Sequence, residues 1–137
     1  MIELPDLTIK VESPSSSDDV SDLVALCCAN TGMDPELYAP NAQFIVARLG
    51  GRPVGCIALV DQLRFAEARR LYVVDDVRGN GIGAALVAAM EAAARDLGLR
   101  RVRLNLSTSG RHARRTFQQA GLYSVSAADV GWLEKSL

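Results

Sequence analysis

The stretch that decides the fold is residues 69–84, which read RRLYVVDDVRGNGIGA. An extended apolar run, residues 71–74, is followed by two aspartates and then by Gly79, Gly81 and Gly83. Apolar residues then recur at helical spacing over residues 82–97, and Gly98 stands where helices commonly end. The sequence therefore predicts a strand, a glycine-rich turn and a helix in that order.

The glycine-rich turn has the properties of an anion-binding site. The first N–H groups of a helix have no partner inside the helix, and the aligned peptide dipoles give them a partial positive charge. Glycines let ligand oxygens approach the backbone, and Arg78 adds a fixed charge beside them. A turn that served only the fold would not need three glycines in five residues. We therefore expect a phosphate-bearing ligand here.

Two other phosphate-binding motifs fit this turn less well. Gly79, Gly81 and Ala84 match the loose dinucleotide pattern G-x-G-x-x-A. However, residues 75–78 separate the glycines from the strand, and the next predicted strand, residues 101–106, carries no acidic residue to hold a ribose. A nucleotide-binding P-loop is excluded because the chain contains no G-K-S/T sequence.

The flanking segments predict a mixed α/β sheet. The Gly50-Gly51 pair indicates a tight hairpin, and residues 53–60 are apolar on both faces, so helices should cover both sides of the sheet. Residues 67–106 form a strand–helix–strand crossover, which makes its two strands parallel. Strands are expected at 7–11, 42–49, 53–60, 67–74, 101–106, 122–126 and 130–135, and helices from 20 to about 30, at 82–97 and at 111–120.

Composition limits the class of protein. The 137 residues suit one domain, residues 1–137, and the 49% apolar content suits a packed core. A formal net charge of −1 argues against a nucleic-acid binder. We expect no signal peptide, no membrane segment and a cytoplasmic location. Three cysteines are too few for a disulfide framework, and one histidine is too few for a histidine-based metal site.

With the order of elements in place, the chain resembles the GNAT-type N-acetyltransferase superfamily. The pyrophosphate motif of that family reads Q/R-x-x-G-x-G/A, which Arg78, Gly81 and Gly83 match. Further matches are Gly55 in the hairpin strand and Ala113, Phe117 and Gly121 in the last helix. The resemblance implies a GNAT-like fold: a mixed, mostly antiparallel central sheet with one parallel βαβ crossover and helices on both faces.

The resemblance also implies a function: transfer of an acetyl group from acetyl-CoA to the amine of a small molecule by direct attack. No metal, nucleic acid or membrane is implied, and a homodimer is possible in this family. The backbone around the turn would bind the pyrophosphate, and the preceding strand would bind the pantetheine arm and the thioester. The residues so implied are Arg78, Gly79, Asn80, Gly81, Ile82, Gly83 and Ala84 for the first role and Leu71, Tyr72 and Val73 for the second.

The acid–base groups depart from the common family pattern. Many members carry a tyrosine as the acid at the position of Phe117, which has no proton to give, and Tyr72 and Tyr123 are the alternatives nearest in sequence. Glu67 is the candidate catalytic base; otherwise it is a surface charge paired with Arg69 or Arg70. Asn105 and Arg111 are further candidates to contact CoA or the acceptor.

Two regions are expected to form the acceptor pocket, residues 30–41 and residues 61–66. Their side chains (Thr31, Met33, Tyr38, Gln62 and Arg64) give no charge signature, so the acceptor stays unnamed. The missing acid at Phe117 leaves a non-catalytic acyl-CoA binding or sensing module as an alternative. A further alternative, an acyl-enzyme formed on Cys56 or a helix cysteine, requires an exposed thiol of low pKa.

Overall fold

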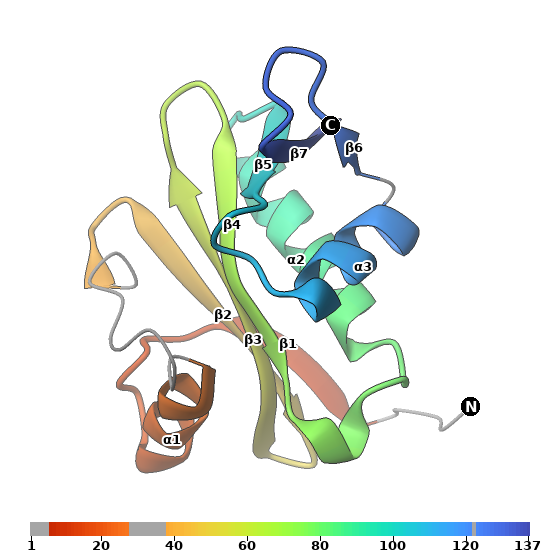
Figure 1. The fold of residues 1–137 in the computed structure, drawn as a ribbon. Helices are drawn as coiled ribbons and strands as arrows, with labels where there is room; N and C mark the ends of the chain where they lie inside the picture. The colour runs from red at the N-terminus through yellow and green to blue at the C-terminus, as the bar shows by residue number, and fades with distance from the viewer. Residues whose placement is uncertain (1–5, 28–37, 122) are drawn as a thin grey trace.

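A computed structural model of the chain describes residues 6–27, 38–121 and 123–137 (Figure 1). The described elements have the predicted order, with a short 3-10 turn, η2, added before the second helix. They are β1 (Leu7–Val11), α1 (Asp18–Cys27), β2 (Ala42–Leu49), β3 (Arg52–Asp61), β4 (Ala66–Val73), η2 (Asp75–Val77), α2 (Ile82–Asp96), β5 (Arg101–Asn105), α3 (Arg111–Gln119), β6 (Ser124–Val125) and β7 (Trp132–Ser136). The predicted end of the first helix, near residue 30, lies outside the described residues.

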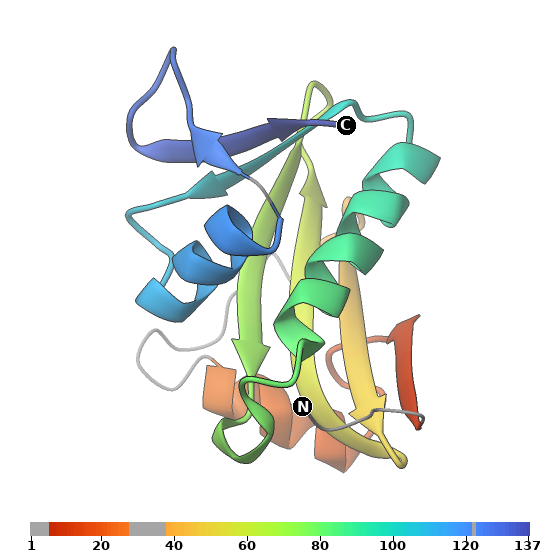
Figure 2. The ribbon, with the colours of Figure 1, turned by 90° about the vertical axis from the view of Figure 1, so that its right-hand side faces the viewer.

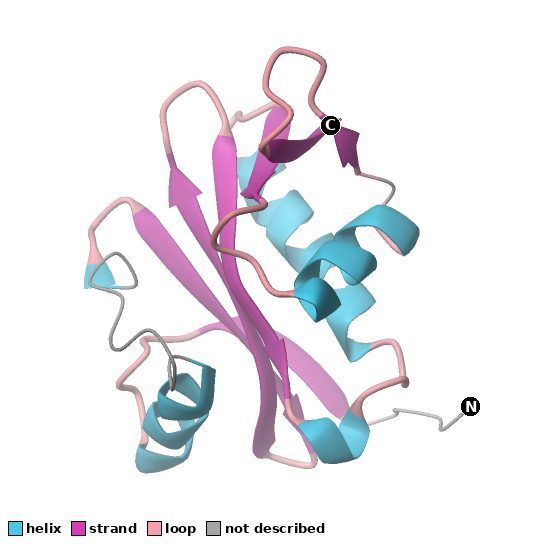
Figure 3. Ribbon diagram, viewed as in Figure 1, coloured by secondary structure: helices cyan, strands magenta, loops and turns pink. Residues whose placement is uncertain are grey.

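The seven strands form one mixed sheet in the order β1-β2-β3-β4-β5-β7-β6. All neighbouring strands are antiparallel except β4 and β5, which are parallel and joined through α2 (Figure 3). This arrangement confirms the expected sheet with a single parallel crossover. It also brings the N-terminus of α2 to the carboxyl end of β4, which is where open α/β sheets bind ligands.

Helices cover both faces of the sheet, as the two-sided apolar pattern of β3 predicts (Figures 1 and 2). Cys56 of β3 faces α1, because its thiol and that of Cys27 both approach the carbonyl of Arg70. The adjacent Gly55 faces α2, since a Cβ there would lie 3.0 Å from the Leu86 side chain. No helix in the described ranges is long and apolar enough to cross a membrane.

The parallel strands β4 and β5 pair over only a few residues and then diverge. This divergence opens the space for a site. β5 pairs with β4 only from Ala66 to Ala68, while β4 continues to Val73 (Figure 2). A β-bulge lies in the same region of β4, because Arg70 and Leu71 together oppose a single residue of β3. Arg70 has a φ of 56°, a left-handed conformation that is rare for a side chain of this size. The second half of β4 therefore has an irregular backbone and an edge that β5 does not cover.

Candidate functional site

A groove follows the uncovered half of β4 and is closed on its other side by α3 and the loop before it. It consists of three adjoining hollows: the first shares Arg78 and His112 with the second, and the second shares Arg70, Thr108 and Ser109 with the third. We call it the β4–α3 groove. All residues that the sequence predicted for CoA binding line it except Asn80: Leu71, Tyr72, Val73, Arg78, Gly79, Gly81, Ile82, Gly83 and Ala84.

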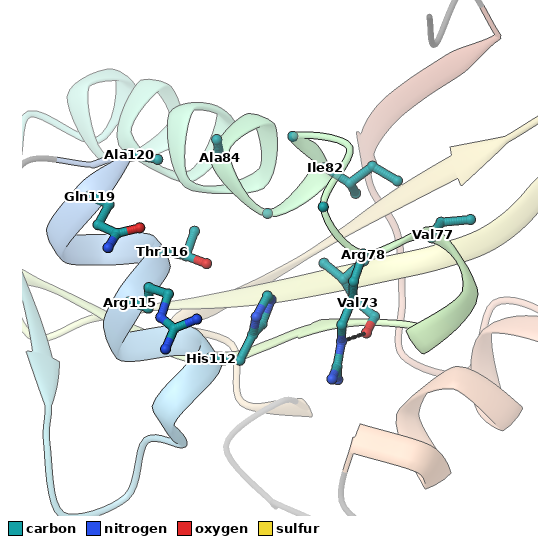
Figure 4. Close-up of a pocket in the computed structure, with 13 residues that line it drawn as sticks. Val73, Val77, Arg78, Ile82, Ala84, His112, Arg115, Thr116, Gln119 and Ala120 are labelled. Carbon is teal, nitrogen blue, oxygen red and sulfur yellow. Dashed lines mark hydrogen bonds between the residues drawn. The ribbon is translucent and has the colours of Figure 1, made fainter. Parts of the chain in front are cut away.

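The first hollow lies at the N-terminus of α2 (Figure 4). Gly81 is the N-cap residue with a φ of 85°, and no side chain in the described part of the protein caps the helix. The first helical hydrogen bond runs from the N–H of Ala85 to the carbonyl of Gly81. The N–H groups of Ile82, Gly83 and Ala84 therefore lie at an uncapped helix N-terminus. Such unpaired N–H groups favour the binding of an anion.

The three glycines of the turn have two different roles. Gly79 and Gly81 both have positive φ, and an added Cβ would meet nothing within 4 Å at either position. Gly83 has ordinary helical geometry, but a Cβ there would lie 3.3 Å from the methyl group of Thr116 on α3. Two glycines therefore provide the backbone shape of the turn, whereas the third lets α2 and α3 pack closely. The expectation that all three clear space for a ligand misses this packing role.

Asn80 stabilises the turn from within instead of lining the groove. Its Nδ2 donates to the carbonyl of Val77 over 3.0 Å. A contact between CoA and this residue through its backbone stays a prediction.

Arg78 joins the end of β4 to the anion site. Its Nε donates to the carbonyl of Val73 over 2.8 Å, and its Nη1 lies 2.9 Å from a carboxylate oxygen of Asp75. The guanidinium also lies over the ring of Tyr72, 5.6 Å from the ring centre. These contacts hold a positive charge where the first and second hollows meet.

The bulge orients the backbone of the second hollow. The carbonyl of Arg70 accepts hydrogen bonds from the thiols of Cys56, over 3.4 Å, and Cys27, over 3.7 Å. In a trans peptide the carbonyl and the following N–H point in opposite directions, so the N–H of Leu71 points away from the thiols. Cys56 is fully buried, which argues against it as an acyl-enzyme nucleophile.

Glu67 lines the third hollow and is only 4% exposed. Its Oε2 accepts from Nε of Arg69 over 2.6 Å, and its Oε1 accepts from Nε2 of Gln62 over 3.1 Å. The pairing with Arg69 matches the alternative of a structural ion pair, but the carboxylate is buried rather than at the surface. A buried carboxylate that lines a groove is a candidate for acid–base work, provided that it can reach the proton it accepts.

Some of the other residues predicted to contact CoA or the acceptor line the groove, and others do not. Asn105 lines the third hollow, where its Oδ1 accepts from the N–H and hydroxyl of Ser107, and Arg111 lines the second. Of the expected acceptor residues, Gln62 meets Glu67, whereas Tyr38 lines a separate hollow between β2 and the β1–α1 connection. Thr31 and Met33 lie outside the described residues.

The candidate acids separate clearly. Phe117 is fully buried and packs edge-on against Tyr123, with ring centres 4.8 Å apart. Tyr123 is itself buried and does not line the groove, and burial raises the pKa of its hydroxyl far above the ordinary value. Tyr72 lines the second hollow. Among these aromatic side chains, only Tyr72 lines the groove.

Sequence analysis assigned no role to His112, which lines the first and second hollows. Its pKa is lowered by burial and by the positive charges of Arg78 and Arg115. No motif indicated this residue. Its position at the start of a helix that follows a parallel strand could have indicated that it lies near the ligand-binding end of the sheet. Within the described ranges, no group of three or more histidine, cysteine, aspartate or glutamate side chains could hold a metal ion.

The model of the acetyltransferase (GNAT) family matches residues 12–122, and the chain belongs to this family. An "IAA acetyltransferase" of Azospirillum brasilense is 38% identical over 65 residues, which are 46% of this chain and 42% of that protein. The match thus spans less than half the length of that relative.

Two solved structures share the fold over nearly the whole chain. A GNAT family acetyltransferase from Elizabethkingia anophelis with acetyl-CoA bound has a TM-score of 0.75 at 13% identity, and the match covers 97% of this chain and 99% of that one. The aminoglycoside 6'-N-acetyltransferase from Enterococcus faecium has a TM-score of 0.73 at 19% identity, with coverage of 94% and 96%. At these identities the likeness concerns the fold.

Proposed function

We propose that the protein is an acetyl-CoA-dependent N-acetyltransferase that acetylates the amine of a small molecule by direct attack. The observation that carries the proposal is the β4–α3 groove, which leads from the uncapped N-terminus of α2 to the buried carboxylate of Glu67. Membership of the GNAT family supports it. So do the names of the A. brasilense relative and of the acetyl-CoA-bound structure from E. anophelis.

The residues of the groove fit the parts of acetyl-CoA in order. The N–H groups at the start of α2, together with Arg78, suit the pyrophosphate. The backbone of Leu71–Val73 lies on the uncovered edge of β4 and suits the amides of the pantetheine arm. The thioester would then reach the bulge, where the N–H of Leu71 points away from the thiols. A backbone donor at a thioester oxygen contributes about 3 kcal/mol to catalysis.

When bound, acetyl-CoA supplies the acetyl group: a bond forms between the amine nitrogen and the carbonyl carbon, the C–S bond breaks, and the thiolate of CoA leaves. Glu67 accepts the proton that the attacking amine must lose, directly or through a water molecule. Its ion pair with Arg69 holds the carboxylate at the end of the third hollow. The thiolate takes its proton from Tyr72 or from water, since Phe117 offers none.

The substitution Glu67→Gln tests the catalytic role of this carboxylate. General-base catalysis contributes about 10²–10⁴-fold, so we expect kcat/KM to fall by about 100-fold near neutral pH. The deficit should shrink as pH rises toward the pKa of the amine, because more acceptor is then already deprotonated. The measurement is thiol release from acetyl-CoA over a panel of amines between pH 6 and 9.

Glu134→Gln is the matched control, because Glu134 is a half-buried carboxylate on β7 that faces Arg103 and does not line the groove. It should keep wild-type kcat/KM. A Glu67→Gln variant with wild-type kcat/KM across the whole pH range would exclude Glu67 as the base. Acetyl-CoA binding without thiol release for any amine would instead favour the sensing module. The cytoplasmic location and the homodimer stay predictions.

A further inference from the structure

His112 has a buried nitrogen atom that nothing in the described part of the protein satisfies. It lies on α3 one residue after the helix begins, and its Nε2 has no hydrogen-bond partner there. Figure 4 shows its imidazole extending from α3 toward Arg78 and the start of α2. Leaving such an atom unpaired costs about 1–3 kcal/mol, and proteins usually satisfy it with water or a ligand.

Positive charge surrounds this imidazole. Arg78, from the turn before α2, and Arg115, from the next turn of α3, both act on it. The first turn of α2 carries no acidic side chain. The carboxylates of η2 are mostly exposed and paired elsewhere, Asp75 with Arg78 and Asp76 with Arg52. Burial and the two guanidinium groups lower the pKa of His112 and so favour the neutral ring in the free protein.

We propose that His112 binds the pyrophosphate of CoA through Nε2 and takes up a proton from solvent as the ligand binds. The inference rests on the proposed function, because it requires CoA to lie in the first hollow. Two phosphate charges beside Arg78 and Arg115 would cancel the field that keeps the proton away. The imidazolium would then donate its Nε2–H to a phosphate oxygen, a charge-assisted hydrogen bond that the neutral ring cannot match.

The direction of the pH dependence follows from this coupling. The bound protein holds its proton to a higher pH than the free protein does. Between the two pKa values of His112, affinity therefore rises as pH falls, and each unit of difference corresponds to a tenfold change in Kd. Above the pKa of the bound state, the ring is neutral in both states and contributes no pH dependence.

The experiment uses dephospho-CoA, because the 3'-phosphate of CoA would itself titrate near pH 6 and obscure the result. His112 is the only histidine in the chain, so its ring protons give a single set of NMR signals. We expect the pKa of His112 to be higher by about one unit or more with saturating dephospho-CoA than without it. Calorimetry at pH 7 in two buffers of different ionisation enthalpy should show net proton uptake on binding. An unchanged or lower pKa in the complex would overturn the inference.

His112→Gln provides the second test, because glutamine keeps a polar donor but cannot titrate. We expect Kd for dephospho-CoA to rise about fivefold or more at pH 6.5, and proton uptake to disappear. Arg114→Gln, an exposed position of α3 outside the groove, is the control and should keep the wild-type Kd. If His112→Gln binds like the wild type at every pH, the inference is wrong. If the wild type does not bind dephospho-CoA at all, the proposed function itself fails.

Discussion

At the scale of single residues, the turn before α2 depends on glycine for its backbone conformation. Gly81 adopts a φ of 85° at the N-cap, and Gly98, just after the same helix, adopts a φ of 78°. An added Cβ would meet no atom within 4 Å at either site. A substitution at either glycine is therefore destabilising only because of its positive φ. No steric clash of the new side chain contributes to the change in stability.

This pair of glycines gives a matched prediction. Gly81→Ala and Gly98→Ala should each lower the free energy of unfolding by about 1–2 kcal/mol, because an L-residue is strained at positive φ. Only Gly81→Ala should weaken acetyl-CoA binding, about tenfold or more, since Gly98 lies at the far end of α2. Urea unfolding and calorimetric titration measure the two effects. Equal affinities for the two variants would argue against an anion site at Gly81.

At the scale of elements, the packing of α3 places the side chain of Phe117 in the core and not in the groove. The ring of Phe117 lies fully inside the protein, edge-on against Tyr123, on the side of the helix that faces the core. The groove instead meets the face of α3 that carries His112, Arg115 and Thr116. A hydroxyl at position 117 would therefore enter the core and not the groove.

Phe117→Tyr should accordingly fail to supply an acid. We expect it to destabilise the protein by about 2 kcal/mol or more, through overpacking and an unpaired buried hydroxyl, and to leave kcat no higher than in the wild type. Phe65→Tyr makes the same change on a half-buried ring, and it should lower stability less than Phe117→Tyr does. A Phe117→Tyr variant with raised kcat would show that position 117 does reach the thiolate.

The elements also show where sequence reasoning succeeds and where it stops. Periodicity, hairpin glycines and the crossover predicted every described strand and α-helix, although not the 3-10 turn η2, because these signals lie in short stretches of sequence. The bulge at Arg70, the divergence of β4 and β5, and the buried nitrogen of His112 were not predicted. Each depends on contacts between residues far apart in the chain. The same limit applies to a further residue, Glu91. Its carboxylate is buried and lies 3.0 Å from the ammonium group of Lys135, which is 44 positions away in the chain.

At the scale of the whole molecule, one parallel pair in an otherwise antiparallel sheet is enough to assemble the groove. The crossover through α2 sets a helix N-terminus beside the carboxyl end of β4. Because β4 and β5 stop pairing after a few residues, a space opens between them. Helix α3 and the loop before it line the other side of this space. The glycine turn, the uncovered strand edge and Glu67 belong to consecutive parts of the chain, residues 67–84, which is why the sequence alone could indicate most of the candidate site.

Because the groove connects α2, α3, β4 and β5, a ligand that fills it should stabilise the whole fold and not one segment. At a free concentration of about 100 times Kd, acetyl-CoA should add about 2.7 kcal/mol to the free energy of unfolding. For a chain of this length, that raises Tm by about 5–10 °C. NAD carries a pyrophosphate but no pantetheine arm, so it should give a much smaller shift at the same concentration. Equal shifts for both ligands would assign the glycine turn to dinucleotides in general, and no shift at millimolar acetyl-CoA would leave the turn with a purely structural role.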